Sequence, residues 1–207
     1  MFGDFQKTIG VRYRHCSLDN FELSLDADIL KHQQGVLKDL RDYLERLPEN
    51  VAAGRGLFLY GPVGGGKDHL LAAAMMFAFR DGFKTKWENG QGLYSHFRDA
   101  IKSDTPEWKL IRQFTAPRVL AISDPSPPEG PITSHQMNML QQVVDGRYRD
   151  QRPTWWTLNV ANKKDAEAKF GVALVDRMLD GALALPMAWP SFRKSVKRDE
   201  FRAGGQA

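Results

Sequence analysis

The chain has 207 residues, of which 42% are hydrophobic and 26% are charged, and its formal net charge at pH 7 is +4. No apolar run approaches the ~20 residues that a membrane-spanning helix needs, residues 1–7 lack the apolar core of a signal peptide, and the single cysteine, Cys16, excludes an internal disulfide and a cysteine-based zinc site. We therefore expect a cytoplasmic globular protein without a membrane partner, whose moderately basic charge permits contact with nucleic acid but does not require it.

Residues 1–25 show no periodic pattern, and we expect them to be irregular and extended. Leucines at helical spacing then predict a helix over residues 26–47, which Pro48 ends. After this helix, short apolar segments alternate with longer segments of helical spacing. Strands are expected at 56–61, 83–88, 119–122, 153–161 and 182–187, and helices at 69–80, 93–102, 106–114 and 134–149, with one or two more over 163–179.

The alternation of strands and helices predicts an α/β fold in three layers around a parallel sheet. Residues 119–122 are continuously apolar, as in a strand that is buried on both faces. Trp155 and Trp156 are expected to pack on opposite faces of their strand. Residues 125–131 contain too much proline for regular structure. We divide the chain into an N-terminal segment and helix (1–50), a core (51–195) and a disordered tail (196–207).

A glycine-rich segment after the first predicted strand is the most informative part of the sequence. The pattern GxxxxGK is complete at Gly61, Gly66 and Lys67. Glycines let successive backbone N–H groups turn toward phosphate oxygens, the following helix directs its positive dipole end at the same anion, and Lys67 would reach the β- and γ-phosphates. A glycine-rich turn without a ligand is the alternative. The predicted nucleotide-binding residues are Gly61, Pro62, Gly64, Gly65, Gly66, Lys67, Asp68 and His69.

Four segments further along the chain narrow the choice among nucleotide-binding proteins. The strand at 119–122 leads to Ser123-Asp124, and the strand at 153–161 ends at Asn162. The segments VDRML at 175–179 and SFR at 191–193 follow. Together with the loop GPVGGGKDHL, these segments resemble the AAA+ ATPases of the DnaC/IstB family, which are bacterial helicase loaders and transposase helper ATPases. The resemblance covers residues 11–195.

The resemblance assigns roles to three polar residues. Asn162 falls at the sensor-1 position, where an amide orients the attacking water or touches the γ-phosphate; the alternative is an Asn that ends a strand in a turn. Arg177 falls at the arginine-finger position, which reaches the ATP of a neighbouring subunit; the alternative is a helix-face arginine paired with Asp176 or Asp180. Arg193 falls at the sensor-2 position, and the alternative is one more cation in a basic run.

Two positions that concern Mg²⁺ depart from the family pattern. A Ser or Thr normally follows the loop lysine and binds the metal, and Asp68 stands there. Two acids normally end the second motif, and here Ser123-Asp124 replaces them, so that only the second acid, the general base, is matched. Because the inventory of one carboxylate and one hydroxyl is preserved, we expect Asp68 and Ser123 to have exchanged roles around Mg²⁺. The alternatives are a decayed site and a register in which Asp124 is the metal-side acid.

The resemblance implies a P-loop AAA+ core with a short N-terminal helical lead-in, a minimal C-terminal lid, and ATP and Mg²⁺ as ligands. We expect an ATP-binding accessory factor in DNA replication or transposition, similar to a helicase loader or a transposase helper, with weak or partner-stimulated ATPase activity. The alternative is a non-hydrolysing interaction protein whose assembly depends on bound nucleotide. A small-metabolite P-loop kinase is more remote, because Arg177 and Arg193 follow the sensor-like Asn162 and no lid segment is evident.

The implied partners are further copies of the chain in an oligomer or filament, a replicative helicase or transposase, and single-stranded or double-stranded DNA. Independently of the resemblance, basic and aromatic residues are interleaved between positions 84 and 118, and such a mixture can line a path for single-stranded DNA. The alternative is a set of solvated cations and core aromatics. The basic residues are Lys84, Lys86, Arg98, Lys102, Lys109, Arg112 and Arg118, and the aromatic ones are Trp87, Tyr94, Phe97 and Trp108.

Overall fold

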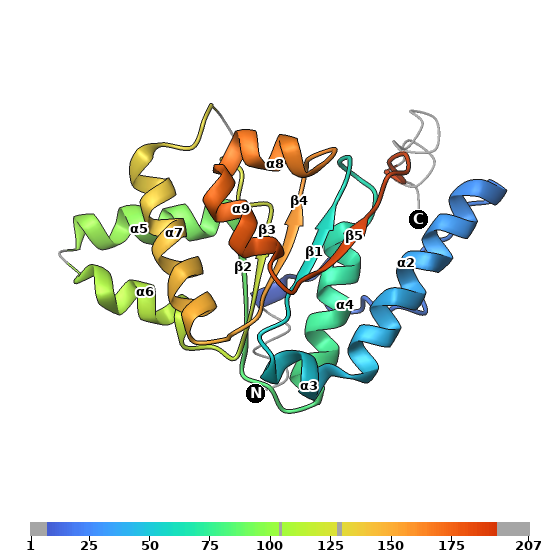
Figure 1. Ribbon diagram of the computed structural model, residues 1–207, viewed down its shortest axis with the longest axis horizontal. Helices are drawn as coiled ribbons and strands as arrows, with labels where there is room; N and C mark the ends of the chain where they lie inside the picture. The colour runs from blue at the N-terminus through green and yellow to red at the C-terminus, as the bar shows by residue number, and fades with distance from the viewer. Residues whose placement is uncertain (1–7, 104, 128–129, 194–207) are drawn as a thin grey trace, which may run out of the picture.

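The computed structural model describes residues 8–103, 105–127 and 130–193 (Figure 1). The tail expected at 196–207 lies outside these described residues. Five strands form one sheet in the order β2-β3-β4-β1-β5, and all neighbouring strands are parallel, which confirms the predicted parallel sheet. The strands are β1 (Leu57–Tyr60), β2 (Thr85–Asn89), β3 (Val119–Ser123), β4 (Thr154–Leu158) and β5 (Leu183–Pro186).

Helices cover both faces of the sheet, so the predicted three-layer arrangement is also confirmed (Figure 1). One face is covered by α2 (Ala27–Glu45), α3 (Leu47–Ala52) and α4 (Lys67–Arg80). The other face is covered by α5 (Gly90–Lys102), α6 (Glu107–Thr115), α7 (Ser134–Arg149), α8 (Lys163–Phe170) and α9 (Val172–Leu179). Within the described part of the chain, no helix is long and apolar enough to span a membrane.

The alternation of side chains along the strands builds a separate apolar core on each face. Leu59 and Trp155 belong to the core beneath α2 and α4, whereas Phe58 and Trp156 belong to the core beneath α5–α9. The two tryptophans therefore pack on opposite faces of β4, as predicted. All five residues of β3 are buried, which explains why residues 119–122 are continuously apolar in sequence.

The helix bounds differ from the sequence-based prediction by a few residues; α4 begins at Lys67 rather than at 69, and α5 begins at Gly90 rather than at 93. The predicted helix at 26–47 ends at Glu45, and Pro48 lies in the first turn of a further short helix, α3. Proline is tolerated there because the first backbone N–H groups of a helix have no intrahelical acceptor. Gly171, with φ of 80°, separates α8 from α9, so the segment 163–179 contains two helices. Residues 187–193, after β5, form neither helix nor strand.

A fully buried arginine, Arg147 on α7, connects the elements at the amino ends of β3 and β4. All five of its guanidinium N–H groups are directed at neutral oxygen acceptors. The last carbonyls of α6 have no intrahelical donors, so the guanidinium supplies their hydrogen bonds. The negative end of the helix dipole also favours a cation at this position. Its acceptors are the Thr154 hydroxyl at 2.9 Å and the carbonyls of Phe114 (2.9 Å), Pro117 (2.9 Å), Arg118 (3.3 Å) and Pro153 (2.6 Å).

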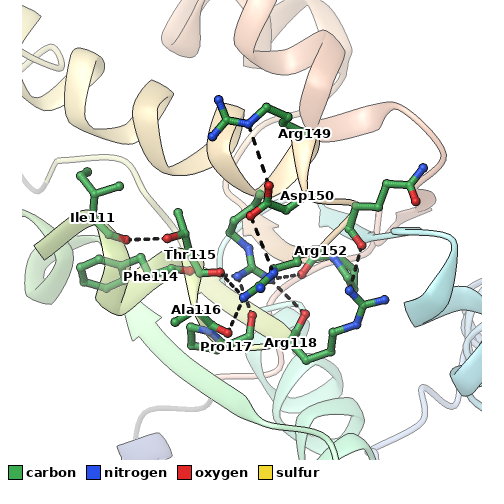
Figure 2. Close-up of polar contacts among 12 residues, drawn as sticks. Ile111, Phe114, Thr115, Ala116, Pro117, Arg118, Arg149, Asp150 and Arg152 are labelled. Carbon is green, nitrogen blue, oxygen red and sulfur yellow. Dashed lines mark hydrogen bonds and ion pairs between the residues drawn. The ribbon is translucent and has the colours of Figure 1, made fainter. Parts of the chain in front are cut away.

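Two further arginines extend this arrangement, which we call the Arg147 cluster (Figure 2). Arg152 donates to the carbonyls of Thr115 and Ala116 at 2.8 and 2.5 Å. Arg118 donates to the carbonyls of Val51 and Gln151 at 2.7 and 3.3 Å. The cluster therefore ties α3, α6 and α7 to the amino end of the sheet.

Candidate nucleotide-binding site

A pocket of about 480 Å³ lies at the carboxyl end of the sheet. It forms where the loop after β1 meets the ends of β3 and β4, which is the edge at which parallel α/β sheets bind ligands. The N-terminal segment 12–22 and residues 192–193 complete its wall. The lining residues are Arg12, Tyr13, Cys16, Phe21, Glu22, Val63, Gly64, Gly66, Lys67, Asp68, His69, Asp124, Thr157, Asn159, Phe192 and Arg193.

The glycine-rich loop has the backbone geometry that its sequence predicts. Gly66 has φ of 88° and directly precedes α4, so the helix begins at Lys67 and directs its N-terminus into the pocket. A Cβ on Gly66 would lie 2.6 Å from the Phe21 ring, and one on Gly64 would lie 1.9 Å from the Ser191 hydroxyl. Side chains at both positions are therefore excluded by close contacts as well as by backbone conformation.

Lys67 is buried within the loop. Its ammonium group donates to the carbonyls of Gly61 at 2.9 Å and Pro62 at 2.7 Å. Burial lowers the pKa of Lys67, and the nearby carboxylates of Asp68 and Asp124 oppose this shift. The loop thus holds a desolvated cation, which favours an incoming anion.

Asp68 lies beside Ser123, as the predicted exchange around Mg²⁺ requires. The Ser123 hydroxyl donates to Asp68 Oδ1 at 2.8 Å, and the Thr157 hydroxyl donates to the same oxygen at 2.7 Å. The Tyr13 hydroxyl lies 3.5 Å from Oδ2. Burial and the Asp68 carboxylate raise the pKa of Tyr13, so this hydroxyl stays protonated. Thr157 and Tyr13 were not predicted as site residues.

Asp124 lines the pocket directly after β3, in the unusual backbone conformation of φ 40°. Its backbone N–H donates to the Thr157 carbonyl at 2.9 Å, and the Asn159 amide donates to its carboxylate oxygen Oδ2. A positive φ in a residue other than glycine is uncommon and is concentrated at functional sites. In this conformation the carboxylate lies next to the pocket, and hydrogen bonds to Thr157 and Asn159 hold the residue in place.

The amide that lines the pocket beside Asp124 is Asn159, whereas the residue predicted for the sensor-1 role is Asn162. β4 ends at Leu158, three residues earlier than the strand predicted at 153–161, so Asn159 is the amide that follows the strand. The Asn162 side chain instead accepts the Asp165 N–H at 3.0 Å and caps α8, and Asn162 is not among the pocket-lining residues. The position of Asn162 thus matches the alternative interpretation, an Asn in the turn after a strand.

The two predicted arginines lie in different places. Arg193 lines the pocket and is exposed. Arg177 on α9 is outside the pocket and pairs with Asp145 on α7 at 3.2 Å, rather than with Asp176 or Asp180. The structure therefore brings Arg193, but not Arg177, to the nucleotide pocket of its own chain.

His69 joins the N-terminal segment to the loop. Its Nε2 lies 2.9 Å from the Ser17 carbonyl, and because a carbonyl only accepts, this nitrogen carries the hydrogen. The His69 ring also meets Phe21 edge-on, with 5.4 Å between ring centroids. Trp189 donates from Nε1 to the Gly65 carbonyl at 2.9 Å, and its ring also meets Phe21 edge-on, with 6.4 Å between ring centroids. The segment around Phe21 thereby forms a fixed wall of the pocket.

The residues present suit Mg²⁺ better than a softer metal. Among the described residues, no three or more His, Cys, Asp or Glu side chains are grouped to hold an ion. Asp68, Ser123 and Thr157 offer oxygen atoms only. Mg²⁺ prefers oxygen ligands and is commonly held by one or two carboxylates together with phosphates and waters. The donor chemistry therefore fits a magnesium ion bound together with a nucleotide.

Most of the aromatic residues proposed for a DNA path belong to the core. Trp87, Tyr94 and Phe97 are buried, whereas Trp108 on α6 is 60% exposed. Of the four aromatics, only Trp108 is therefore available for stacking on a base. Of the basic residues, Lys109 lies over the Trp108 ring at 5.6 Å, and Arg98, Lys102, Lys109 and Arg112 are exposed.

Comparisons with known proteins agree with this geometry. The model of the family described as "IstB-like ATP binding protein" matches residues 15–200. No curated protein matches the sequence. The fold is similar to that of the DnaC helicase loader, with a TM-score of 0.72 and 19% identity over 86% of this chain and 99% of that one. It is also similar to DnaI, with a TM-score of 0.68 and 16% identity over 83% and 90%.

A third similar structure is that of the replication initiator DnaA bound to AMPPCP and single-stranded DNA, with a TM-score of 0.65 and 17% identity. That match covers 86% of this chain and 50% of the DnaA chain. At these identities the three likenesses show a shared fold, the P-loop AAA+ fold.

Proposed function

The chain belongs to the family of IstB-like ATP-binding proteins, and from this premise we propose that it is an ATP-dependent accessory factor of DNA replication or transposition. Such a factor works as a helicase loader or a transposase helper. The observation that carries the proposal is the grouping of Lys67, Asp68, Asp124 and Asn159 in one pocket with the glycine-rich loop. The similarity to the DnaC helicase loader over nearly the whole of that chain supports the same role.

The triphosphate of ATP binds along the loop and the first turn of α4. The backbone N–H groups there and the Lys67 ammonium supply the positive field that the phosphates need. Arg193 at the pocket rim adds a second cation. The wall formed by Tyr13, Cys16 and Phe21 contacts the nucleoside part.

Asp68 and Ser123 hold the Mg²⁺ that accompanies ATP, with their usual positions exchanged. The metal neutralises phosphate charge when it is bound. The Asp68 carboxylate would supply negative charge to the ion, and Ser123 would hold Asp68 in place or hold one of the waters of the ion. The 2.8 Å hydrogen bond between the two side chains supports this pairing.

Asp124 and Asn159 are placed to act on the water that attacks the γ-phosphate. Asp124 accepts a proton from that water, and Asn159 keeps the carboxylate oriented through its hydrogen bond to Oδ2. Arg177 acts on the nucleotide of a neighbouring copy, because it lies outside the pocket of its own chain. This role requires self-association and the opening of its ion pair with Asp145.

The test is steady-state ATP hydrolysis measured with and without single-stranded DNA, alongside calorimetric binding of Mg²⁺–ATP. We expect binding, a slow basal rate that DNA raises, and an activity per subunit that increases with protein concentration. Absence of ATP binding contradicts the proposal. Binding without hydrolysis under every condition supports instead a non-hydrolysing, nucleotide-dependent interaction protein and removes the catalytic role of Asp124.

A further inference from the structure

One polar side chain in the site has no role in the account so far. Thr157 on β4 is buried, with 1% of its surface exposed, between Trp156 and Leu158. Its hydroxyl lies 2.7 Å from Asp68 Oδ1 and 3.2 Å from the backbone nitrogen of Asp124. We propose that Thr157 is a positioning residue for Mg²⁺, because it fixes which oxygen of Asp68 faces the metal.

The direction of each hydrogen bond follows from the chemistry of the groups. The backbone N–H of Asp124 can only donate, so the Thr157 oxygen accepts from it. An ionised carboxylate can only accept, so the Thr157 hydrogen goes to Asp68. Thr157 therefore links the backbone of the catalytic acid to the carboxylate of the metal ligand.

Thr157 and Ser123 together occupy one oxygen of the carboxylate. Both hydroxyls donate to Oδ1, whereas the Tyr13 hydroxyl, at 3.5 Å, is the one contact recorded for Oδ2 within the described residues. A distance of 3.5 Å is at the limit of a hydrogen bond. Oδ2 is thus the oxygen with lone pairs to spare, and it is the oxygen that would bind the metal.

The strand register explains why Thr157 can do this. Thr157 pairs with Ser123 on β3 and with Leu59 on β1, so it sits between the second motif and the strand that leads into the loop. Asn159 is two residues later, and alternate residues of an extended segment point to the same side. β4 thereby supplies a partner for Asp68 at Thr157, and the segment directly after it supplies a partner for Asp124 at Asn159.

The inference rests on the proposed binding of Mg²⁺–nucleotide at this pocket. The experiment measures binding of a non-hydrolysable ATP analogue by calorimetry across a series of Mg²⁺ concentrations, in the full chain and in Thr157→Val. Loss of a residue that supports a metal ligand typically lowers metal affinity about 10- to 100-fold. In Thr157→Val, we expect the Mg²⁺ concentration that gives half of the maximal increase in analogue affinity to rise by about tenfold or more. We expect little change in the affinity measured without Mg²⁺.

Two variants separate positioning from a general effect on the fold. Thr157→Ser keeps the hydroxyl and should restore the Mg²⁺ dependence. Thr85→Val removes a buried hydroxyl on β2 that has no hydrogen-bond partner within the described residues, and it should leave the Mg²⁺ dependence unchanged. If Thr157→Val does not fold, Thr157→Cys supplies the same comparison, because a thiol is a weak donor.

A Thr157→Val protein that folds and shows the Mg²⁺ dependence of the wild type overturns the inference while leaving the proposed function intact. An equal loss of binding with and without Mg²⁺ also overturns it, because the role would then be structural. Wild-type protein that binds no nucleotide at any Mg²⁺ concentration contradicts the proposed function itself.

Discussion

The two ends of the sheet each contain a buried polar network, and the networks differ in how completely their groups are paired. At the amino end, the five N–H groups of Arg147 all have acceptors, and the side chain is fully buried. At the carboxyl end, Asp68 keeps one weakly paired oxygen, and Asp124 adopts a positive φ beside an open pocket. A saturated network fixes the fold, whereas an unsaturated one beside a cavity can bind and react.

The charges at the two ends are also balanced differently. The Arg147 cluster gathers its cations around carbonyl oxygens, and Asp150 is the acid paired with it, 3.9 Å from Arg149 and 4.0 Å from Arg152 (Figure 2). The pocket places Lys67 close to the carboxylates of Asp68 and Asp124. Phosphates and a divalent ion can bind in the pocket, because the phosphates would pair with the Lys67 ammonium and the ion would pair with the carboxylates.

The largest change in stability should come from the saturated end. Arg147→Met leaves buried carbonyls without donors, and a buried acceptor left without a partner typically costs about 1–3 kcal/mol. We expect a loss of this size in the free energy of unfolding, measured by urea denaturation. The matched control is Arg149→Met on the same helix, whose side chain is 81% exposed, and a change within about 0.5 kcal/mol is expected there. Comparable losses in both variants would contradict the stabilising role of the Arg147 cluster.

The next largest effect concerns ligand-dependent stability at the other end. ATP at 100 times its Kd should add about 2.7 kcal/mol to the free energy of unfolding, because it binds the folded state alone. Lys67→Ala removes the loop cation and should abolish this increment, as followed by thermal denaturation with and without Mg²⁺–ATP. Equal ATP-induced shifts in wild type and Lys67→Ala would refute the role of Lys67.

A smaller, graded effect should appear with alkaline pH. Burial lowers the pKa of Lys67 from its ordinary value of 10.5, and ATP binding needs the protonated ammonium. ATP affinity should therefore be fully present below the lowered pKa and decline as pH rises through it, before pH 10.5 is reached. Lys67→Arg, which stays protonated in this range, is the control and should remove the decline. A flat profile for the wild type up to pH 10.5 would contradict the shift.

The sequence was sufficient for features that depend on local signals. The glycines at positions 61–66, the apolar run before them and the helical spacing after them specify strand, loop and helix without help from the rest of the chain. The proximity of Asp68 and Ser123 was also expected, because the loop between β1 and α4 and the end of β3 lie at the same carboxyl edge of the parallel sheet.

The misplaced and missed residues depend on contacts that are distant in sequence. β4 ends where its pairing with β1 ends, at Leu158 beside Tyr60, and this pairing decides that Asn159 rather than Asn162 reaches the pocket. In the sequence, Arg147 looks like a solvated residue on a helix face. Its acceptors include the carbonyl of Pro117, about thirty positions earlier, and this contact is visible only in the structure. Thr157 is ordinary in a strand, and its partner Asp68 is 89 residues away.

The most direct measurement is a double-mutant cycle on the exchanged pair, read as the Kd for Mg²⁺–ATP. Asp68→Thr alone leaves the site without its metal-side carboxylate and should weaken binding about tenfold or more. Adding Ser123→Asp should bring the affinity back, with a coupling of about 1.4 kcal/mol or more, as expected for neighbours that share a ligand. If Asp68→Thr alone tightens binding and creates hydrolysis, Asp68 is a lesion in a decayed ATPase and the exchange is wrong.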